Sequence, residues 1–253
     1  MNTVRSADGT LIAYDRSGEG PAVVLVHGAF TGRTHPILYG VATALAPWFT
    51  VVNYDRRGRG DSGDTQPYAA EREVEDLAAL IEAVGGSAMV FGGSSGAALA
   101  IRAAAGNPAI TRLALWEPPY HVDPSAPPIP DDFAEQLAGL VRRGRRTEAA
   151  ERFMVEAAEA PPGSGAGLEP LAHTLAYEAA VVGPGNALPS GLLAAITQPT
   201  LVLNGDRSPA WMANAGKAVA AGIGGSTHRI LERQAHNVDP AALAPELLEF
   251  FCR

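Results

Sequence analysis

The sequence has a single cysteine, Cys252, among its 253 residues. No intramolecular disulfide can therefore form, which fits a reducing compartment and excludes the class of disulfide-rich secreted domains. No stretch approaches the roughly 18 consecutive apolar residues that a membrane-spanning helix needs. The first residues lack the apolar segment of a secretory signal, so we expect a cytoplasmic protein.

Clustered positive charge and metal-binding patterns are scarce as well. The formal net charge is -8, which excludes nucleic acid and membrane surfaces as partners, because both attract basic patches. The basic segment 142–146 is interpreted as the solvated end of a helix. No histidines or cysteines are paired at metal-ligand spacing and no G-x-G-x-x-G follows the first buried strand, so we expect neither a metal nor another cofactor. The remaining partner is a small molecule, bound by a monomer or a homodimer.

Apolar runs alternate with helical patterns along most of the chain. With 47% hydrophobic and 18% charged residues, the composition is that of a folded globular protein. Short uninterrupted apolar runs predict buried strands at residues 22–26, 49–53, 88–91, 112–116, 200–203 and 227–231. Amphipathic helices are predicted at residues 37–46, 71–84, 96–105, 211–221 and 240–251. With a hairpin of residues 2–5 and 11–15 at the start, the pattern predicts an α/β fold, a mostly parallel eight-stranded sheet with helices on both faces.

One interval interrupts this alternation. Residues 118–198 contain helical patterns at 133–141, 148–157 and 168–181, with joints rich in proline and glycine, but no strand pattern. We interpret this interval as a helical lid inserted into a core domain of residues 1–117 and 199–253. An ordinary surface elaboration is the alternative.

The pentapeptide that begins at Gly92 fits G-x-S-x-G, the strand-to-helix turn that exposes a nucleophilic serine. Such a turn needs tiny residues two positions either side of the serine, because a Cβ would collide there with the neighbouring backbone. By itself the pattern could also be a flexible loop rich in glycine and serine. The spacing from the preceding buried strand favours Ser94 as the nucleophile, with Ser95 as the alternative in a register shifted by one.

Three further strand ends carry groups of matching chemistry. In an open parallel sheet, ligands bind at the carboxyl ends of the strands. Asp206 and His236 follow the last two predicted strands, and Ala29 lies in the small-residue loop after the first buried one. A serine, a base, an acid and a backbone donor are therefore expected at one edge of the sheet. Glu117 also follows a strand and is the alternative to Asp206 as the acid.

These residue types together support nucleophilic catalysis. A serine hydroxyl is a weak nucleophile at neutral pH, and His236 is the candidate for the base that takes its proton. Asp206 would accept a hydrogen bond from the other ring nitrogen and so fix the tautomer of the imidazole. The backbone N–H groups of Ala29 and Ser95 would bind the tetrahedral oxyanion.

The chain resembles members of the α/β-hydrolase fold family over nearly its whole length. The resemblance rests on the turn that begins at His27, on the segment from Asp55 to Ser62, similar to the family's D-x-R-G-x-G-x-S loop, on the elbow, and on the order Ser…Asp…His. It implies a lid inserted after the sixth strand, and some relatives take their acid from the position of Glu117. The family often has a histidine just before the nucleophile, where this chain has Gly93.

The predicted function is that of a serine hydrolase acting on a carboxylic ester, lactone or related acyl compound through an acyl-enzyme. C–C bond hydrolysis and cofactor-free perhydrolysis could use the same triad, and a hydrolase-fold ligand-binding protein with little turnover is a further alternative. An apolar acyl or aromatic substrate is expected. Its predicted pocket consists of large apolar side chains, which could equally be ordinary core: Phe30, Trp116, Met154, Tyr177 and Trp211.

Overall fold

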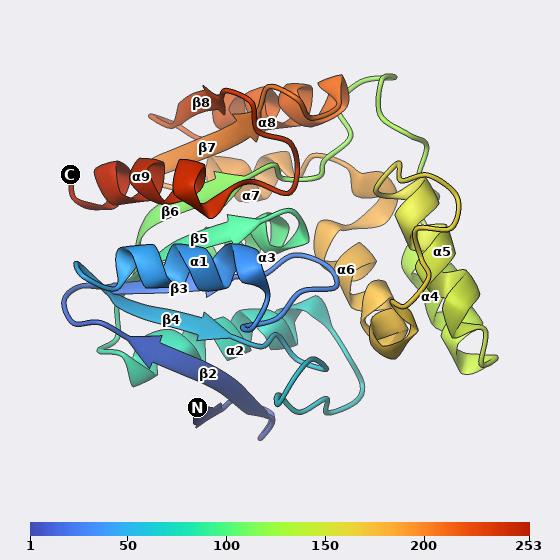
Figure 1. The fold of residues 1–253 in the computed structure, drawn as a ribbon, viewed down its shortest axis with the longest axis horizontal. Coiled ribbons are helices and arrows are strands. Elements are labelled where there is room, and N and C mark those ends of the chain that lie inside the picture. The colour runs from blue at the N-terminus through green and yellow to red at the C-terminus, as the bar shows by residue number, and fades with distance from the viewer.

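The core of the protein is an eight-stranded sheet in the order β1-β2-β4-β3-β5-β6-β7-β8 (Figure 1). The computed structural model describes residues 1–253. The strands are β1 (Asn2–Arg5), β2 (Leu11–Ser17), β3 (Ala22–Val26), β4 (Thr50–Tyr54), β5 (Ala88–Gly93), β6 (Ile110–Trp116), β7 (Thr200–Gly205) and β8 (Thr227–Leu231). β2 pairs antiparallel with both β1 and β4, and all other neighbours are parallel. The predicted fold class is confirmed, including the hairpin at the start.

Helices cover both faces of this sheet. One face carries α1 (Pro36–Leu45) and α9 (Pro240–Phe251), and the other carries α2 (Ala70–Ala83), α3 (Ser95–Ala104) and α8 (Ala210–Gly222) (Figure 1). Successive residues of a strand point to opposite faces. Val24 and Val26 of β3 therefore pack with α2 and α3, whereas Val23 and Leu25 pack with α1 and α9. Burial on both faces explains why the central strands are uninterrupted apolar runs.

The segment 118–198 contains helices and no strand. Its elements are α4 (Phe133–Arg142), α5 (Arg146–Glu156), the 3-10 helix η1 (Glu169–Thr174), α6 (Leu175–Val182), the 3-10 helix η2 (Pro184–Asn186) and α7 (Ser190–Ala194). Figure 1 shows α4, α5 and α6 beyond the carboxyl ends of the strands. These helices and η1 share a small apolar cluster, which consists of Phe133, Leu137, Leu140, Ala149, Ala150, Ala172, Leu175 and Ala179. The role of this insertion as a lid remains a prediction.

Two helices of the insertion also belong to the core of the sheet. Val181 and Val182 of α6 and Leu193 of α7 lie in the same buried cluster as the apolar residues of α3. Arg102 of α3 also donates a hydrogen bond to the carbonyl oxygen of Val181 at 2.5 Å. The insertion is therefore continuous with the core and not merely tethered to it by its two chain connections.

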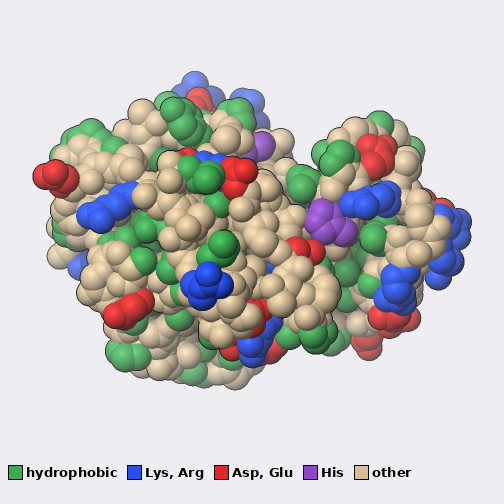
Figure 2. All heavy atoms as spheres, turned by 90° about the horizontal axis from the view of Figure 1, so that it is seen from below, with side chains coloured by type: hydrophobic (Ala, Val, Ile, Leu, Met, Phe, Trp, Pro, Cys, Tyr) green, Lys and Arg blue, Asp and Glu red, His purple; other side chains and the backbone are tan.

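Many charged side chains of the insertion lie on its outer surface (Figure 2), whereas Glu178 of α6 is buried. The basic segment 142–146 lies on that outer surface, with Arg142 paired to Glu135 and Arg145 paired to Glu148. It is exposed at the end of α4, as the sequence predicts. No helix in the structure combines the length and the hydropathy that crossing a bilayer requires.

A sharp turn joins β5 to α3. Ser94, between them, has a φ of 55° and a ψ of -127°, a conformation that L-residues rarely adopt. A Cβ on Gly92 would lie 2.4 Å from the carbonyl oxygen of Gly96, and a Cβ on Gly96 would lie 2.4 Å from that of Val26. The glycines at both ends of the pentapeptide are therefore required by the close approach of backbone to backbone.

This packing predicts different outcomes for two neighbouring glycines. Gly96→Ala is expected to lower the melting temperature by roughly 4–10 °C, because the added methyl group must displace backbone of β3. Gly93→Ala is the matched control, since its Cβ would meet nothing closer than 3.9 Å. The melting temperature of both purified variants, followed by circular dichroism, tests the prediction. A melting temperature of Gly96→Ala equal to that of Gly93→Ala would contradict it.

Candidate active site

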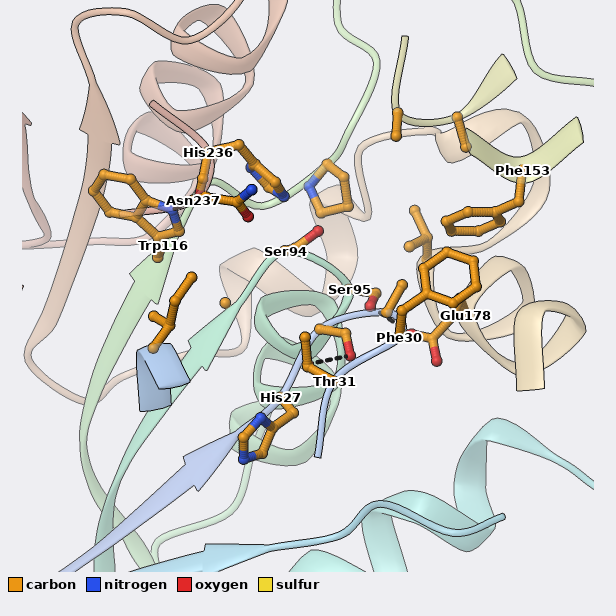
Figure 3. A pocket seen from close by; sticks show the side chains of 18 of the residues that line it. His27, Phe30, Thr31, Ser94, Ser95, Trp116, Phe153, Glu178, His236 and Asn237 are labelled. Carbon is orange, nitrogen blue, oxygen red and sulfur yellow. Dashed lines mark hydrogen bonds between the residues drawn. The ribbon is translucent and has the colours of Figure 1, made fainter. Parts of the chain in front are cut away.

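A cavity of about 590 Å³ lies between the carboxyl ends of the strands and the insertion. Ser94 and His236 both line it, and Figure 3 shows their side chains reaching into it from different elements. Ser94 occupies the turn after β5, and His236 lies in the loop after β8. The structure therefore brings the predicted nucleophile and the predicted base to one cavity.

The strained turn holds Ser94 through its backbone. Its N–H donates to the carbonyl oxygen of Trp116 on β6 at 2.8 Å, and its own carbonyl oxygen accepts from the N–H of Ala97 at 2.8 Å. These bonds fix the serine between the end of the sheet and the first turn of α3. Its side chain is thus held at the cavity by main-chain contacts on both sides.

His236 pairs with Glu117 and not with Asp206. The Nδ1 atom of His236 lies 2.7 Å from Oε2 of Glu117, whose other oxygen accepts a hydrogen bond from the N–H of Gly205 at 2.9 Å. Glu117 is fully buried, whereas Asp206 is exposed. The prediction of Asp206 as the partner of the histidine is therefore wrong, and the alternative, Glu117, is confirmed in that position.

The reach of the glutamate explains this difference. Glu117 directly follows β6, and its side chain extends past the end of the adjacent β7 to the loop that carries His236. An aspartate is one methylene shorter. The N–H of Gly205, immediately before Asp206, is occupied by Glu117, while Asp206 itself turns outward to solvent.

The contact with Glu117 also sets the tautomer of His236. A carboxylate accepts hydrogen bonds, so in the neutral imidazole Nδ1 carries the proton and Nε2 is the acceptor. The loop is held further by Trp116, whose indole N–H donates to the carbonyl oxygen of His236 at 3.0 Å. The basic nitrogen of the ring is thereby left for a group inside the cavity.

Two backbone N–H groups meet the requirement for an anion site. Ala29 and Ser95 both line the cavity, and neither N–H donates a hydrogen bond to another group of the protein. Ser95 is the first residue of α3, where the unpaired N–H groups and the helix dipole favour negative charge. Both groups lie where the sequence predicts an oxyanion hole.

His27 braces the loop that contains Ala29. Its Nε2–H donates to Oδ1 of Asn53 at 2.6 Å, and Nδ2 of Asn53 donates to the carbonyl oxygen of Arg33 at 2.8 Å. Burial lowers the pKa of His27 to about 4, so the ring is neutral near pH 7. His27 therefore acts as a hydrogen-bonding strut of the loop and carries no charge into the cavity.

Three of the five predicted pocket side chains line the cavity: Phe30, Trp116 and Met154. Tyr177 and Trp211 do not. The ring of Tyr177 stacks on Tyr68 at 3.7 Å, and Trp211 is buried with its indole N–H donating to Glu159. These two aromatic residues contribute to packing outside the cavity, and their prediction as pocket residues is wrong.

Several apolar residues that line the cavity were not predicted from the sequence. The insertion and α8 contribute Phe133, Phe153, Leu168, Val182 and Met212. The rings of Phe153 and Phe30 meet edge to face at 5.5 Å, so the insertion contacts the loop after β3 at the wall of the cavity. Phe153 of α5 and Ala157, the residue that caps this helix, both line the cavity and lie four residues apart, a helical spacing that could have identified this face.

Comparisons with known proteins identify relatives of this fold. A model of the alpha/beta hydrolase family matches residues 23–246. The crystal structure of an alpha/beta hydrolase from Sphaerobacter thermophilus DSM 20745 is 51% identical, covers 99% of this chain and 100% of its own, and superposes with a TM-score of 0.92. An esterase from Exiguobacterium antarcticum, 18% identical, shares the fold with a TM-score of 0.75 over 100% of this chain and 99% of its own.

A curated relative is similar over a shorter region. The uncharacterized hydrolase YraK of Bacillus subtilis (strain 168) is 36% identical over 104 residues, which are 40% of this chain and 38% of that protein. The matched segment thus spans little more than a third of that relative. The family match, by contrast, covers most of this chain from β3 into α9. The chain belongs to the alpha/beta hydrolase family.

Proposed function

We propose that this protein is a serine hydrolase that cleaves a carboxylic ester, lactone or related acyl compound through an acyl-enzyme. The catalytic triad in this proposal consists of Ser94, His236 and Glu117. The observation that carries it is the 2.7 Å contact between His236 and the buried Glu117, at a cavity that the strained Ser94 also lines. Hydrolysis is also the activity class that the family membership supports.

The first half of the reaction forms the acyl-enzyme. Nε2 of His236 takes the proton of the Ser94 hydroxyl as the oxygen attacks the ester carbonyl carbon. Glu117 stabilises the imidazolium that results, since its carboxylate faces the protonated Nδ1. The carbonyl oxygen becomes an oxyanion and accepts hydrogen bonds from the N–H groups of Ala29 and Ser95, each typically worth about 3 kcal/mol to the transition state.

Loss of the alcohol completes the acyl-enzyme, and a second half-reaction then releases the acid. The tetrahedral species collapses, and His236 gives its proton to the departing alkoxide, which leaves as an alcohol. A water molecule then attacks the acyl carbon, with His236 taking its proton. Collapse of this second tetrahedral species breaks the bond to Ser94, and the histidine returns the proton to the serine oxygen. The net change is the addition of water across one acyl–oxygen bond.

The lining of the cavity supports an uncharged acyl group as substrate. Its wall contains large apolar side chains and no lysine, arginine or aspartate. The one carboxylate of the wall is Glu178, which is fully buried and already paired with arginine. A substrate carboxylate would therefore enter without a cation to pair with, at a large desolvation cost.

The identity of the nucleophile is the first prediction of this mechanism. A fluorophosphonate should label the protein at Ser94, and Ser94→Ala should lose both the label and the turnover of a short-chain p-nitrophenyl ester. Mass spectrometry of the labelled peptide separates the two adjacent serines, and Ser95→Ala is the control that should keep the label. Labelling of Ser94→Ala at its usual rate would contradict the assignment. Tight ligand binding without turnover in the wild type would instead favour a binding protein.

The identity of the acid gives a second prediction. Glu117→Gln should lower kcat by roughly 10³- to 10⁴-fold, because an amide can hold the wrong tautomer of His236 and cannot stabilise the imidazolium. Asp206→Asn is the matched control and should keep kcat within about twofold, since an exposed carboxylate away from the histidine contributes little. Steady-state kinetics of both variants decide the matter. The reverse order of effects would return the role to Asp206.

The polarity of the cavity gives a third prediction. The value of kcat/KM should be at least about 100-fold higher for 4-nitrophenyl hexanoate than for mono-4-nitrophenyl adipate, which has the same chain length with a terminal carboxylate. The two esters share a leaving group, so their difference reports the acyl side alone. Equal values for the two esters would show that the cavity accepts charge.

A further inference from the structure

A cluster of four buried charged side chains lies against the candidate oxyanion hole. We define the ion cluster as Arg56 and Arg59, from the loop after β4, Glu73 of α2 and Glu178 of α6. Both nitrogens of one edge of Arg56 donate to Glu73 at 2.7 Å, and its Nη1 donates to Glu178 at 2.8 Å. Two cations face two carboxylates, so the cluster is neutral as a whole and can persist without solvent.

Arg59 holds the peptide group that carries one of the two candidate donors. Its Nη1 donates to the carbonyl oxygen of Gly28 at 2.6 Å and to that of Thr31 at 3.1 Å. The carbonyl of Gly28 and the N–H of Ala29 belong to the same peptide group. A charged donor on the carbonyl polarises that peptide and makes its N–H a stronger donor, because hydrogen bonds in series reinforce one another. Arg59 thus acts on the N–H of Ala29 through the carbonyl group of the same peptide.

Glu178 holds the residue that carries the other candidate donor. The hydroxyl of Ser95 donates to Oε2 of Glu178 at 2.5 Å, and Oε1 of the same carboxylate contacts the Arg59 guanidinium. Figure 3 shows Glu178 on the side of the pocket where Ser95 and Phe30 lie, away from His236. The two N–H groups of the proposed oxyanion hole are therefore tied to each other through one carboxylate that comes from the insertion.

The sequence pattern of the turn after β4 does not call for arginine at positions 56 and 59. In the family pattern D-x-R-G-x-G-x-S, Arg56 and Arg59 occupy positions that the pattern leaves open, whereas Arg57 occupies the arginine position. Arg57 pairs with Asp76 and Asp8 on the far side of the loop. Burial and the neighbouring Arg56 lower the pKa of Arg59. The carboxylate of Glu178 contacts its guanidinium and so stabilises the charged form.

We propose that Arg59 and Glu178 are positioning residues of the oxyanion hole, Arg59 orienting and polarising the N–H of Ala29 through the Gly28 carbonyl and Glu178 orienting Ser95 through its hydroxyl. This inference rests on the proposed serine hydrolase function. A purely structural role, in which the ion cluster only fastens α6 to the core, would affect stability and leave the chemistry of the folded enzyme unchanged.

The double variant Arg59→Met/Glu178→Leu separates these roles. It removes one cation and one anion together, so no uncompensated charge is left in the core. With a p-nitrophenyl ester, kcat should fall roughly 10- to 100-fold while KM stays within about threefold, because the lost interactions act on the transition state. Inhibition by an alkyl trifluoromethyl ketone, whose adduct with Ser94 carries an oxyanion, should weaken by a similar factor. The single variant Arg59→Lys keeps a cationic donor at this position, so its kcat should lie between that of the wild type and that of the double variant.

The matched control is Arg57→Met/Asp76→Leu. Arg57 belongs to the same loop as Arg59 and pairs with Asp76 of α2; both residues are buried, and neither lines the cavity. The control should lose stability and keep kcat and the inhibition constant. A folded Arg59→Met/Glu178→Leu variant with unchanged kcat and inhibition constant would overturn the positioning role.

A readout without turnover keeps this inference separate from the proposed function. In a ¹⁵N–¹H spectrum, the N–H proton of Ala29 should move upfield in Arg59→Met/Glu178→Leu, because its peptide group loses polarisation. The N–H proton of Ser95 should also shift, because the hydroxyl of that residue loses the hydrogen bond that orients it. Both protons should stay in place in the Arg57→Met/Asp76→Leu control. The proposed function fails if the wild type lacks Ser94-dependent ester cleavage. The positioning role is tested separately, and protons that do not move would overturn it even then. If the wild type cleaves esters and the protons do not move, only the positioning role fails.

Discussion

The close approach of α3 to the ends of β3 and β5 determines where Ser94 and the two candidate oxyanion donors lie. Gly96 contacts the backbone of Val26 so closely that no side chain fits between them, and Gly92 meets Gly96 in the same way. This contact forces Ser94 into its strained backbone conformation and points the first N–H groups of α3 at the cavity. The loop after β3, which carries Ala29, is set beside them by the same contact. Strain at one residue is thus compensated by the packing of the whole central sheet.

The sequence predicts the sheet and the location of the site well, because both follow from simple periodic rules. Strands buried on both faces must be apolar throughout, and the carboxyl ends of parallel strands must meet at one edge, which brought Ser94 and His236 to a common cavity. The choice between Asp206 and Glu117 depends on side-chain reach across β7, which strand order along the chain does not encode. Tyr177 and Trp211 could not be separated from true pocket residues, since an aromatic residue in a core and one in a cavity follow the same pattern.

The insertion contributes both an apolar wall and a charge to the site. Phe153 and Met154 of α5 face the cavity, while Glu178 of α6 reaches the loop after β4 through the arginines of the ion cluster. Of the ion cluster only Glu178 lines the cavity, and the arginines behind it neutralise its charge, so the wall stays largely apolar. Sequence patterns assign Glu178 only to a helix. Its partners, Arg56 and Arg59, lie far away in the chain and meet it only through the packing of α6.

The position of the acid at the end of β6 determines which substitutions this edge of the sheet can tolerate. Glu117 is anchored by a main-chain N–H of Gly205, a group that every residue type except proline provides. The exposed turn that begins at Asp206 supplies no side chain to His236. Substitutions of the Asp206 side chain are consequently free of this constraint, whereas the backbone of the turn still bonds to the segment before His236 through the N–H groups of Asp206 and Arg207. Natural variation among close homologues should be tolerated at Asp206 and forbidden at Glu117.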